Sequence, residues 1–197
     1  MTKFFNRWDA DAIQVQDPGL KRYISLTPIM VPKTGGRNVK TQFHRSKTSL
    51  VERLINKLMV PGHKGKRHKV TSRHATGKAA HCYAIVQRAF AKLEQQAKRN
   101  PVEVFVRAVE NAAPREEINT IQYGGARYPQ AVECGPQRRI DLALRLMVQG
   151  AYGKSFGTKR KIEDTLAEEI LLAFQADTKS NAVAKKLELE RQADASR

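Results

Sequence analysis

The stretch from Asn100 to Gly150 constrains the fold of this 197-residue chain more than any other, because it reads as helix, hairpin, helix. Asn100 is a helix-capping residue type, and Pro101 suits the first turn of a helix. One buried helical face is predicted by apolar residues at i, i+3, i+4 and i+7, namely Val102, Phe105, Val106 and Val109. The helix is expected to end at Ala113, since Pro114 disfavours helical geometry in the residue before it.

Two extended runs follow, Ile118–Tyr123 and Arg127–Cys134, and they are joined by Gly124 and Gly125. Paired glycines allow the positive φ angles of tight hairpin turns, so a β-hairpin is expected at about 116–134. A second helix should begin at Pro136. Its apolar residues lie nearly all round it, which predicts a place at the centre of the core: Ile140, Leu142, Ala143, Leu144, Leu146, Met147 and Val148.

The hairpin carries little aliphatic surface, and a lone two-stranded ribbon is marginally stable in water. Pro129 removes a backbone donor from its second strand. Two interpretations remain open. The ribbon either packs against the domain or forms an arm that a partner orders, and its polar composition favours the arm.

Four more helices complete a mainly α fold of about six helices in one domain, residues 46–197. The first begins at Ser49, which forms a capping-box pair with Glu52, and the second runs from about Gly77 to Arg99. The others begin at Thr158 and Ser180, and the last is weakly apolar, so it either packs loosely or lies along a partner. Residues 1–45 are expected to form an extended basic arm in which Leu20–Leu26 alternates like an edge strand.

Positive charge is concentrated in one third of the chain, which has a formal net charge of +17. The segment Arg37–Arg99 holds 16 lysine and arginine residues against two acidic ones, whereas Asn100–Arg197 holds 15 against 14. Positive charge concentrated in one segment in this way requires a polyanionic partner. The candidate phosphate-contacting residues of this segment are Arg37, Lys40, Arg45, Lys47, Lys64, Lys66, Arg67, Lys69, Arg73 and Lys78.

The most basic loop, 63–78, also contains His63, His68 and His74, which invites a metal interpretation. We reject it, because no carboxylate or cysteine completes a four-ligand set and crowded cations oppose a dication. No cofactor is expected either. Cys82 and Cys134 are too few for a disulfide framework, so buried free thiols in a reducing, cytoplasmic compartment are expected. No apolar run is long enough to span a membrane.

Two classes of function compete at this point. A structural RNA-binding protein explains the one-sided charge and a ribbon without a core of its own. The rival is a helical nucleic-acid-binding regulator or an RNA-modification factor. An enzyme should show clustered acids, yet the pair Glu116 and Glu117 is explained by solvation or helix capping, and Asp141 is expected to pair with Arg145 on its helix.

Several runs of the sequence resemble the universal small-subunit ribosomal protein seven family, and the likeness covers nearly the whole chain. The arm before Ser46 and the ending Ala182–Arg197 are similar to the archaeal branch of that family. The runs that carry the likeness are Val51–Met59, Asn100–Phe105, Glu110–Glu116, Tyr123–Tyr128, Pro136–Arg139 and Ala143–Arg145.

The resemblance implies a non-catalytic protein of the small ribosomal subunit. It implies binding to the 3′ major domain of small-subunit ribosomal RNA and nucleation of the subunit head, with neighbouring head and platform ribosomal proteins as partners. The basic first-helix segment and the link after it would face this RNA, and Arg138 and Arg139 would bind RNA at the base of the hairpin. The arm itself would reach exit-site transfer RNA and messenger RNA through Arg115, Tyr123, Gly124, Gly125, Arg127 and Tyr128.

Overall fold

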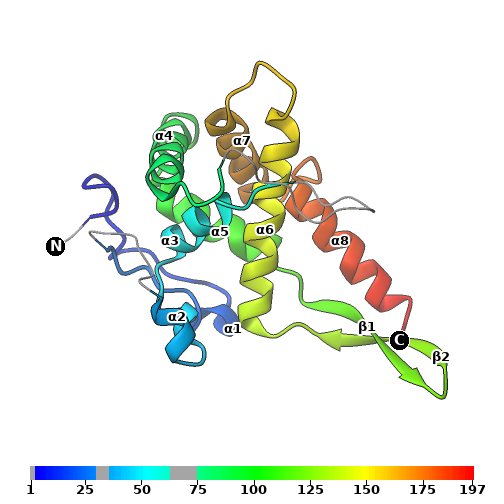
Figure 1. Cartoon of the computed structure of the whole chain (residues 1–197). Helices are drawn as coiled ribbons and strands as arrows, with labels where there is room; N and C mark the ends of the chain where they lie inside the picture. The colour runs from blue at the N-terminus through cyan, green and yellow to red at the C-terminus, as the bar shows by residue number, and fades with distance from the viewer. Residues whose placement is uncertain (1–2, 30–35, 63–74) are drawn as a thin grey trace.

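Six helices of nine residues or more build the body of the protein in the computed structural model, which describes residues 3–29, 36–62 and 75–197 (Figure 1). Two shorter helices and a 3-10 turn precede them in the described part of the chain. The elements are α1 Pro18–Lys21, α2 Arg37–Lys40, η1 His44–Lys47, α3 Leu50–Leu58, α4 Ala79–Ala97, α5 Pro101–Ala112, β1 Glu116–Tyr123, β2 Ala126–Glu133, α6 Pro136–Ser155, α7 Ile162–Phe174 and α8 Asn181–Asp194. The predicted mainly α architecture with one hairpin is confirmed.

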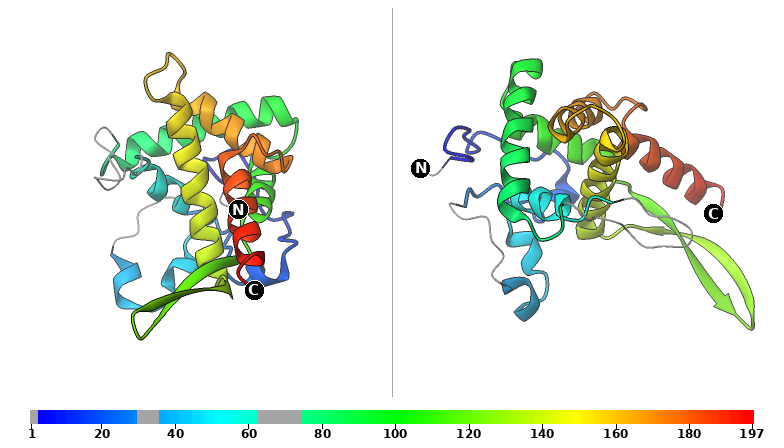
Figure 2. Two further views of the ribbon diagram at one scale, coloured as in Figure 1. Left: turned by 90° about the vertical axis from the view of Figure 1, so that its right-hand side faces the viewer. Right: turned by 45° about the horizontal axis from the view of Figure 1, so that its top comes forward.

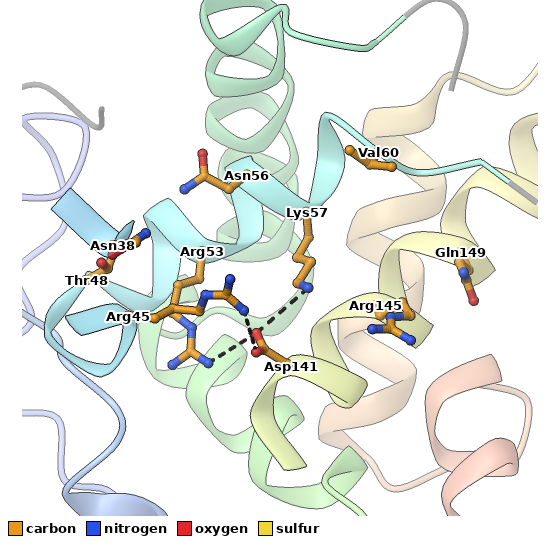
Figure 3. A pocket seen from close by; sticks show the side chains of 10 residues that line it. All are labelled: Asn38, Arg45, Thr48, Arg53, Asn56, Lys57, Val60, Asp141, Arg145 and Gln149. Atoms are coloured by element: carbon orange, nitrogen blue, oxygen red, sulfur yellow. Dashed lines mark hydrogen bonds and ion pairs between the residues drawn. The ribbon is translucent and has the colours of Figure 1, made fainter. Parts of the chain in front are cut away.

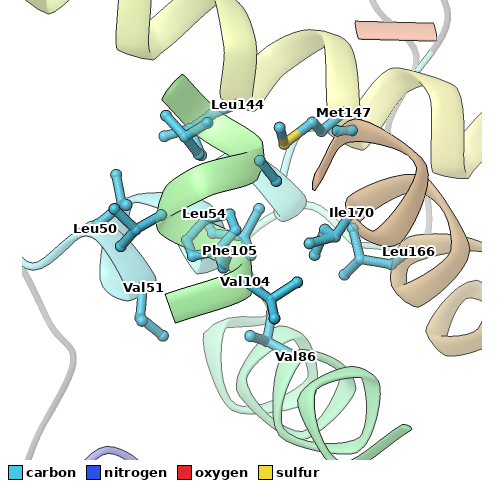
Figure 4. Packing of buried hydrophobic residues seen from close by; sticks show 14 of the residues in the cluster. Leu50, Val51, Leu54, Val86, Val104, Phe105, Leu144, Met147, Leu166 and Ile170 are labelled. Atoms are coloured by element: carbon cyan, nitrogen blue, oxygen red, sulfur yellow. The ribbon is translucent and has the colours of Figure 1, made fainter. Parts of the chain in front are cut away.

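Helix α5 occupies the centre of the core, with α3, α4, α6 and α7 packed around it (Figure 4). Asn100 caps it as predicted, because its side-chain oxygen accepts a hydrogen bond from the Val102 amide. Phe105 is fully buried, and the centroid of its ring lies 5.6 Å from the ring centroid of Phe90 on α4. Helix α6 also contacts α1, α3, α5, α7 and α8, in agreement with the central place that we expected for it, but Leu142 and Leu146 are only half buried, so α6 is not buried all round.

The hairpin extends away from the helices (Figures 1 and 2). Its strands are antiparallel, and Gly124 and Gly125 form the turn with φ angles of 52° and 90°. These positive values are those of the tight turn that the paired glycines predicted. Residues 119–130 are exposed, so the tip contributes nothing to the core. The arm interpretation is the one that this geometry supports.

The base of the hairpin is held by ion pairs that the sequence analysis missed. Glu117 accepts two hydrogen bonds from Arg138, at 2.5 and 2.6 Å, and Glu116 accepts from Arg197 at 2.5 Å. Glu116 and Glu117 are therefore not explained by solvation or helix capping. They join the first strand to the start of α6 and to the C-terminal residue, which lies beside the hairpin in Figure 1.

The N-terminal segment lies against the body. Trp8 is buried, and its ring packs 6.0 Å from that of Phe90. The backbone amides of Gln16 and Asp17 donate to the Glu110 carboxylate on α5, at 2.6 and 3.0 Å. The domain boundary near residue 45 stays a prediction.

The edge strand expected at Leu20–Leu26 does not form. Leu20 belongs to α1, which Asp17 caps through the amide of Gly19, and Pro18 stands in its first turn. Of the expected strand, only an isolated bridge between Ser25 and Ser49 appears in the described residues. The Asp-Pro-Gly sequence is a helix-start signal, and it overrides the alternation that follows it.

One helix boundary and one helix cap also differ from the prediction. Helix α7 begins at Ile162 and not at Thr158, because the Thr158 hydroxyl donates to the carbonyl oxygens of Lys154 and Ser155 in the preceding turn. Ser49 does begin α3, but its side chain makes no capping hydrogen bond, so the capping box is wrong.

The prediction of free cysteines is confirmed, because Cys82 and Cys134 are both buried and form no disulfide bond.

Helix α8 is docked against the body through a buried carboxylate. Glu169 of α7 is fully buried, and it accepts hydrogen bonds from Ser180 at 2.8 Å and from the Ala182 amide at 3.2 Å. Lys154 of α6 pairs with the other oxygen at 3.0 Å. Of the two options left open for α8, packing on the domain is the one observed, and it depends on this polar centre as well as on Ala182 and Val183.

Candidate nucleic-acid interface

Helix α3 sorts its side chains into an apolar stripe and a cationic edge. Val51, Leu54, Ile55 and Leu58 are buried in the core, as their spacing predicted. Arg53 and Lys57 are four residues apart and therefore share the edge of α3 that faces α6. The side chain of Arg53 is only 3% exposed, although its Nε has no hydrogen-bond partner among the described residues. Arginine is rarely buried to this extent unless its donors are paired.

Three cations from two elements converge on one carboxylate of α6, as Figure 3 shows. Arg45 Nη1 lies 2.9 Å from Asp141 Oδ2, and Arg53 Nη2 lies 3.3 Å from Oδ1. Lys57 Nζ lies 3.8 Å from the same Oδ1. Arg53 also donates to the carbonyl oxygen of Tyr23 at 3.1 Å. Asp141 thus pairs with these residues and not with Arg145, so the predicted pair within α6 is wrong.

Burial and neighbouring charge shift the pKa values of Asp141 and Lys57 in this cluster. Burial raises the pKa of the Asp141 carboxyl, but the charges of Lys57, Arg53 and Arg45 outweigh burial and hold the pKa below its ordinary value. Burial lowers the pKa of the Lys57 ammonium, and the positive charge of Arg145, Arg45 and Arg53 lowers it further against the opposing effect of Asp141. The cluster therefore carries more positive charge than Asp141 balances.

The cluster lines a cavity of about 520 Å³ between α2, η1, α3 and α6. Arg145 stands on its α6 side, one turn after Asp141, and is exposed. The lining also includes three side-chain amides. The full set is Asn38, Arg45, Thr48, Arg53, Asn56, Lys57, Val60, Asp141, Arg145 and Gln149 (Figure 3). Such a site can receive an anionic group and offer hydrogen bonds to whatever is attached to it.

Other predicted contact residues surround this cavity or lie apart from it. Lys40 ends α2, Lys47 ends η1, and both side chains are exposed, as is Lys78 before α4. Arg37 begins α2. The remaining predicted residues of the basic loop, Lys64, Lys66, Arg67, Lys69 and Arg73, lie outside the described residues, as do His63, His68 and His74.

Two of the cations on α4 are neutralised by acidic residues of α7. Arg88 Nε lies 3.0 Å from Glu163, and Lys92 pairs with Asp164 in the first turn of α7. These acids also stabilise the N-terminus of α7. Arg88 and Lys92 are thus engaged in ion pairs within the fold.

The arginines at the base of the hairpin differ in how far their side chains are buried and paired within the fold. Arg138 is bound to Glu117 but remains 57% exposed. The side chain of Arg139 is 12% exposed, pairs with Asp17 at 2.8 Å and donates to the carbonyl oxygen of Pro114 at 3.1 Å. Arg115 is exposed. Contact of any of the three with nucleic acid stays a prediction.

The tip of the hairpin presents aromatic and cationic side chains to solvent. Tyr123 is 78% exposed and Tyr128 is 59% exposed. Arg127 precedes Tyr128 on β2 and lies opposite Gln122 of β1. Ile121 lies opposite Tyr128 and is 40% exposed. Exposed aromatic rings beside a cation suit stacking on bases or packing against a protein.

The described residues offer no site for metal or thiol chemistry. They contain no group of three or more potential metal ligands. Burial raises the pKa of the Cys82 thiol, and burial together with the negative charge of Glu117 raises the pKa of Cys134 to about 11. Neither thiol forms the reactive thiolate at neutral pH. Within the same residues, no helix has the length and apolar character needed to cross a membrane.

Sequence reasoning missed the buried part of this candidate interface. Arg53, Lys57, Asp141 and Arg145 were not among the predicted contact residues, although the first-helix segment was expected to face RNA. A signal was available, since Arg53 and Lys57 are four residues apart beside an apolar stripe. Their meeting with Asp141 was not predictable, because it depends on how α3 crosses α6.

Comparisons with known proteins agree on one family. A sequence model described as ribosomal protein S7p/S5e matches residues 20–197. The small ribosomal subunit protein uS7 of Nanoarchaeum equitans is 51% identical over 195 residues, which is 99% of this chain and 98% of that protein. The protein of the same name from Methanothermobacter thermautotrophicus is 46% identical over 191 residues, 97% of each chain. Both relatives are archaeal, as the resemblance of the two ends of the chain predicted.

Proposed function

Because the chain belongs to the ribosomal protein S7p/S5e family and is a non-catalytic protein of the small ribosomal subunit, we propose that it is a primary binder of the 3′ major domain of small-subunit RNA. In this role it nucleates assembly of the subunit head. The rival class, a regulator or an RNA-modification factor, has no support from these relatives.

One observation carries the proposal: an excess of cations gathered on α2, η1 and α3. Lys40 and Lys47 are exposed, and the nearby cluster at Asp141 holds more positive charge than one carboxylate balances. Phe43 is 63% exposed between them and offers a ring face to an unstacked base. Cations that position phosphates, with a few aromatic contacts, are the usual means of recognising folded RNA.

The hairpin has a separate role in this proposal. Its exposed tip, Tyr123–Tyr128, reaches exit-site transfer RNA and messenger RNA, and its sides meet a neighbouring platform protein. Support comes from its projection beyond the helices and from the exposure of its aromatic residues (Figure 2). The pairs of Glu116 and Glu117 fix the base of the arm, so the direction of the tip is set by the body.

Chemical footprinting of a transcript of the 3′ major domain tests the RNA assignment. The full-length protein should protect nucleotides at one multi-helix junction and keep doing so in excess transfer RNA as competitor. A transcript of another domain of the same RNA is the control and should show no localised protection. Protection that is diffuse, or that the competitor removes, would contradict the proposal, because it would reduce the binding to its non-specific electrostatic part.

A further inference from the structure

The cavity between α3 and α6 is lined by four cationic side chains and only one carboxylate. We propose that it takes a single phosphate of the bound RNA, with the attached nucleotide unstacked into the cavity, and that Arg53, Lys57 and Arg145 hold that phosphate. The inference rests on the proposed function and deepens it, since it assigns one discrete pocket where the family relation implies only RNA binding in general.

Arg53 is the first reason. Its side chain is 3% exposed, and it lines the cavity (Figure 3). The two terminal nitrogens donate to Tyr23 and Asp141, but Nε has no hydrogen-bond partner among the described residues. A buried donor of a charged group that is left unpaired costs free energy, so an incoming acceptor at this position is favourable. Arginine also matches the geometry of a phosphate with two parallel donors.

Charge balance is the second reason. Four cations, Arg45, Arg53, Lys57 and Arg145, line the cavity together with one anion, Asp141. Asp141 is already shared by three of them, and Arg145 is left to face the cavity without an ion pair among the described residues. Burial and like charge lower the pKa of Lys57, which agrees with a surplus of positive potential here. A phosphodiester group relieves this surplus.

Size and polarity are the third reason. A cavity of about 520 Å³ lies within the range of roughly 300–1,000 Å³ that small-molecule sites occupy. A phosphate alone leaves most of that space unfilled, whereas a nucleotide uses it. The amide side chains of Asn38, Asn56 and Gln149 offer donors and acceptors for a base or a ribose hydroxyl. Proteins that recognise folded RNA commonly read bases that have been splayed out of the stack.

Arg145 gives the cleanest test, because it is exposed and lies on the surface of α6. The experiment is ethylation interference on the 3′ major domain transcript, which finds each phosphate whose modification weakens binding. The variants are Arg145→Gln, Arg145→Lys and, as a control with the same loss of charge, Arg191→Gln on α8. Wild type should show a set of sensitive phosphates. Arg145→Gln should lose sensitivity at one of them and keep the rest, while Arg145→Lys and Arg191→Gln should keep all.

Affinity gives a second readout from the same variants. Arg145→Gln should bind about tenfold more weakly. Its slope of log affinity against log salt should be shallower by about 0.7–0.9. Arg191→Gln should leave both values unchanged. Thermal melts of the variants confirm that folding is intact before binding is compared.

An interference pattern that is the same in Arg145→Gln and wild type overturns the inference, while localised protection by wild type would leave the proposed function standing. A second experiment tests whether the occupant of the cavity is a free anion. If inorganic phosphate raises the melting temperature of wild type but not of Arg145→Gln, and the interference pattern is unchanged, the pocket takes free phosphate and the assignment to RNA is wrong. Loss of one sensitive phosphate is the result that supports the assignment.

Discussion

Arg53 and Asp141 stand 88 residues apart in the sequence, yet Arg53 Nη2 lies 3.3 Å from Asp141 Oδ1 across the contact between α3 and α6. The arginine side chain is 3% exposed and the aspartate side chain 16%. This pair joins the basic segment Arg37–Arg99 to the helix that follows the hairpin. Both side chains line the cavity in which we propose an RNA phosphate.

Asp141→Asn should destabilise the free protein by roughly 3 kcal/mol at neutral pH, because it leaves Arg53 buried without its counter-ion. Asp194→Asn on exposed α8 is the control and should cost less than about 1 kcal/mol. Urea unfolding of both variants measures the difference. Bound RNA should reduce the deficit of Asp141→Asn, since a phosphate can replace the lost carboxylate. A deficit of the same size as that of Asp194→Asn would contradict the account.

The same variant predicts a pH dependence. The folded-state pKa of Asp141 is below its ordinary value, so the stability that this carboxylate contributes is present above its unfolded-state pKa, near pH 4. It is lost as the pH falls through the lowered folded-state value. The gap in free energy of unfolding between wild type and Asp141→Asn should therefore be constant from pH 7 down to about pH 4 and shrink below that. A gap that already closes near pH 6 would mean that another group controls the cluster.

Gly150→Ala should weaken the docking of α8 on α6. A Cβ at this position would lie 2.7 Å from Asn181 Cβ and 3.0 Å from the Glu169 carboxyl carbon. Neither atom can move away easily, because a Cβ is fixed by the backbone and the Glu169 side chain is buried. We expect a loss of about 1–3 kcal/mol. Gly153→Ala, on the same helix with no atom within 4 Å of the added Cβ, is the matched control. It should be neutral or stabilising by up to about 1 kcal/mol.

Val106→Asp and Leu144→Asp should unfold the protein. Both side chains are fully buried among apolar neighbours, and an unpaired carboxylate there costs more than about 4 kcal/mol, a large part of the stability of a domain. Circular dichroism and thermal melts check this. Leu187→Asp is the control, because Leu187 is 47% exposed on α8 and should tolerate the change. Cooperative melting of either core variant at the wild-type temperature would show that the packing around α5 is misassigned.

Removal of Tyr123–Tyr128, with a short turn closing the gap, should cost little stability, since residues 119–130 are exposed. Binding to the 3′ major domain should persist, because the cations proposed to bind it lie elsewhere. Small subunits assembled with the shortened protein should retain exit-site transfer RNA differently or lose reading-frame accuracy. Failure of assembly would contradict the separation of roles, since it would make the tip a primary anchor.

Local signals in the sequence predicted the centre of this fold. The cap at Asn100, the turn at Gly124 and Gly125 and the helix start at Pro136 are fixed by neighbouring residues, and all three were found where expected. Each depends on backbone geometry that one or two residues determine, namely a side-chain cap, a positive φ angle and a preset proline φ.

Features that depend on distant residues were the ones that sequence reasoning missed. Asp141 was assigned to Arg145, its neighbour on the helix, but three cations from η1 and α3 reach it instead. Glu117 was read as solvated, although Arg138 binds it through two hydrogen bonds. Helical periodicity gives the face on which a charge lies, but the crossing of two helices decides which partner it meets.

The salt dependence of RNA binding tests the central claim most directly. Lys64, Lys66, Arg67 and Lys69 would be changed together to glutamine and compared with an equally charged control in which Lys159, Lys179, Lys185 and Arg191 are changed. The measured quantity is the slope of log affinity for the 3′ major domain transcript against log salt. The account predicts a slope shallower by up to about 3 for the first variant and nearly unchanged for the control. Equal slopes in the two variants and wild type would contradict it, because the basic segment between Arg37 and Arg99 would then make no phosphate contacts through its most basic loop.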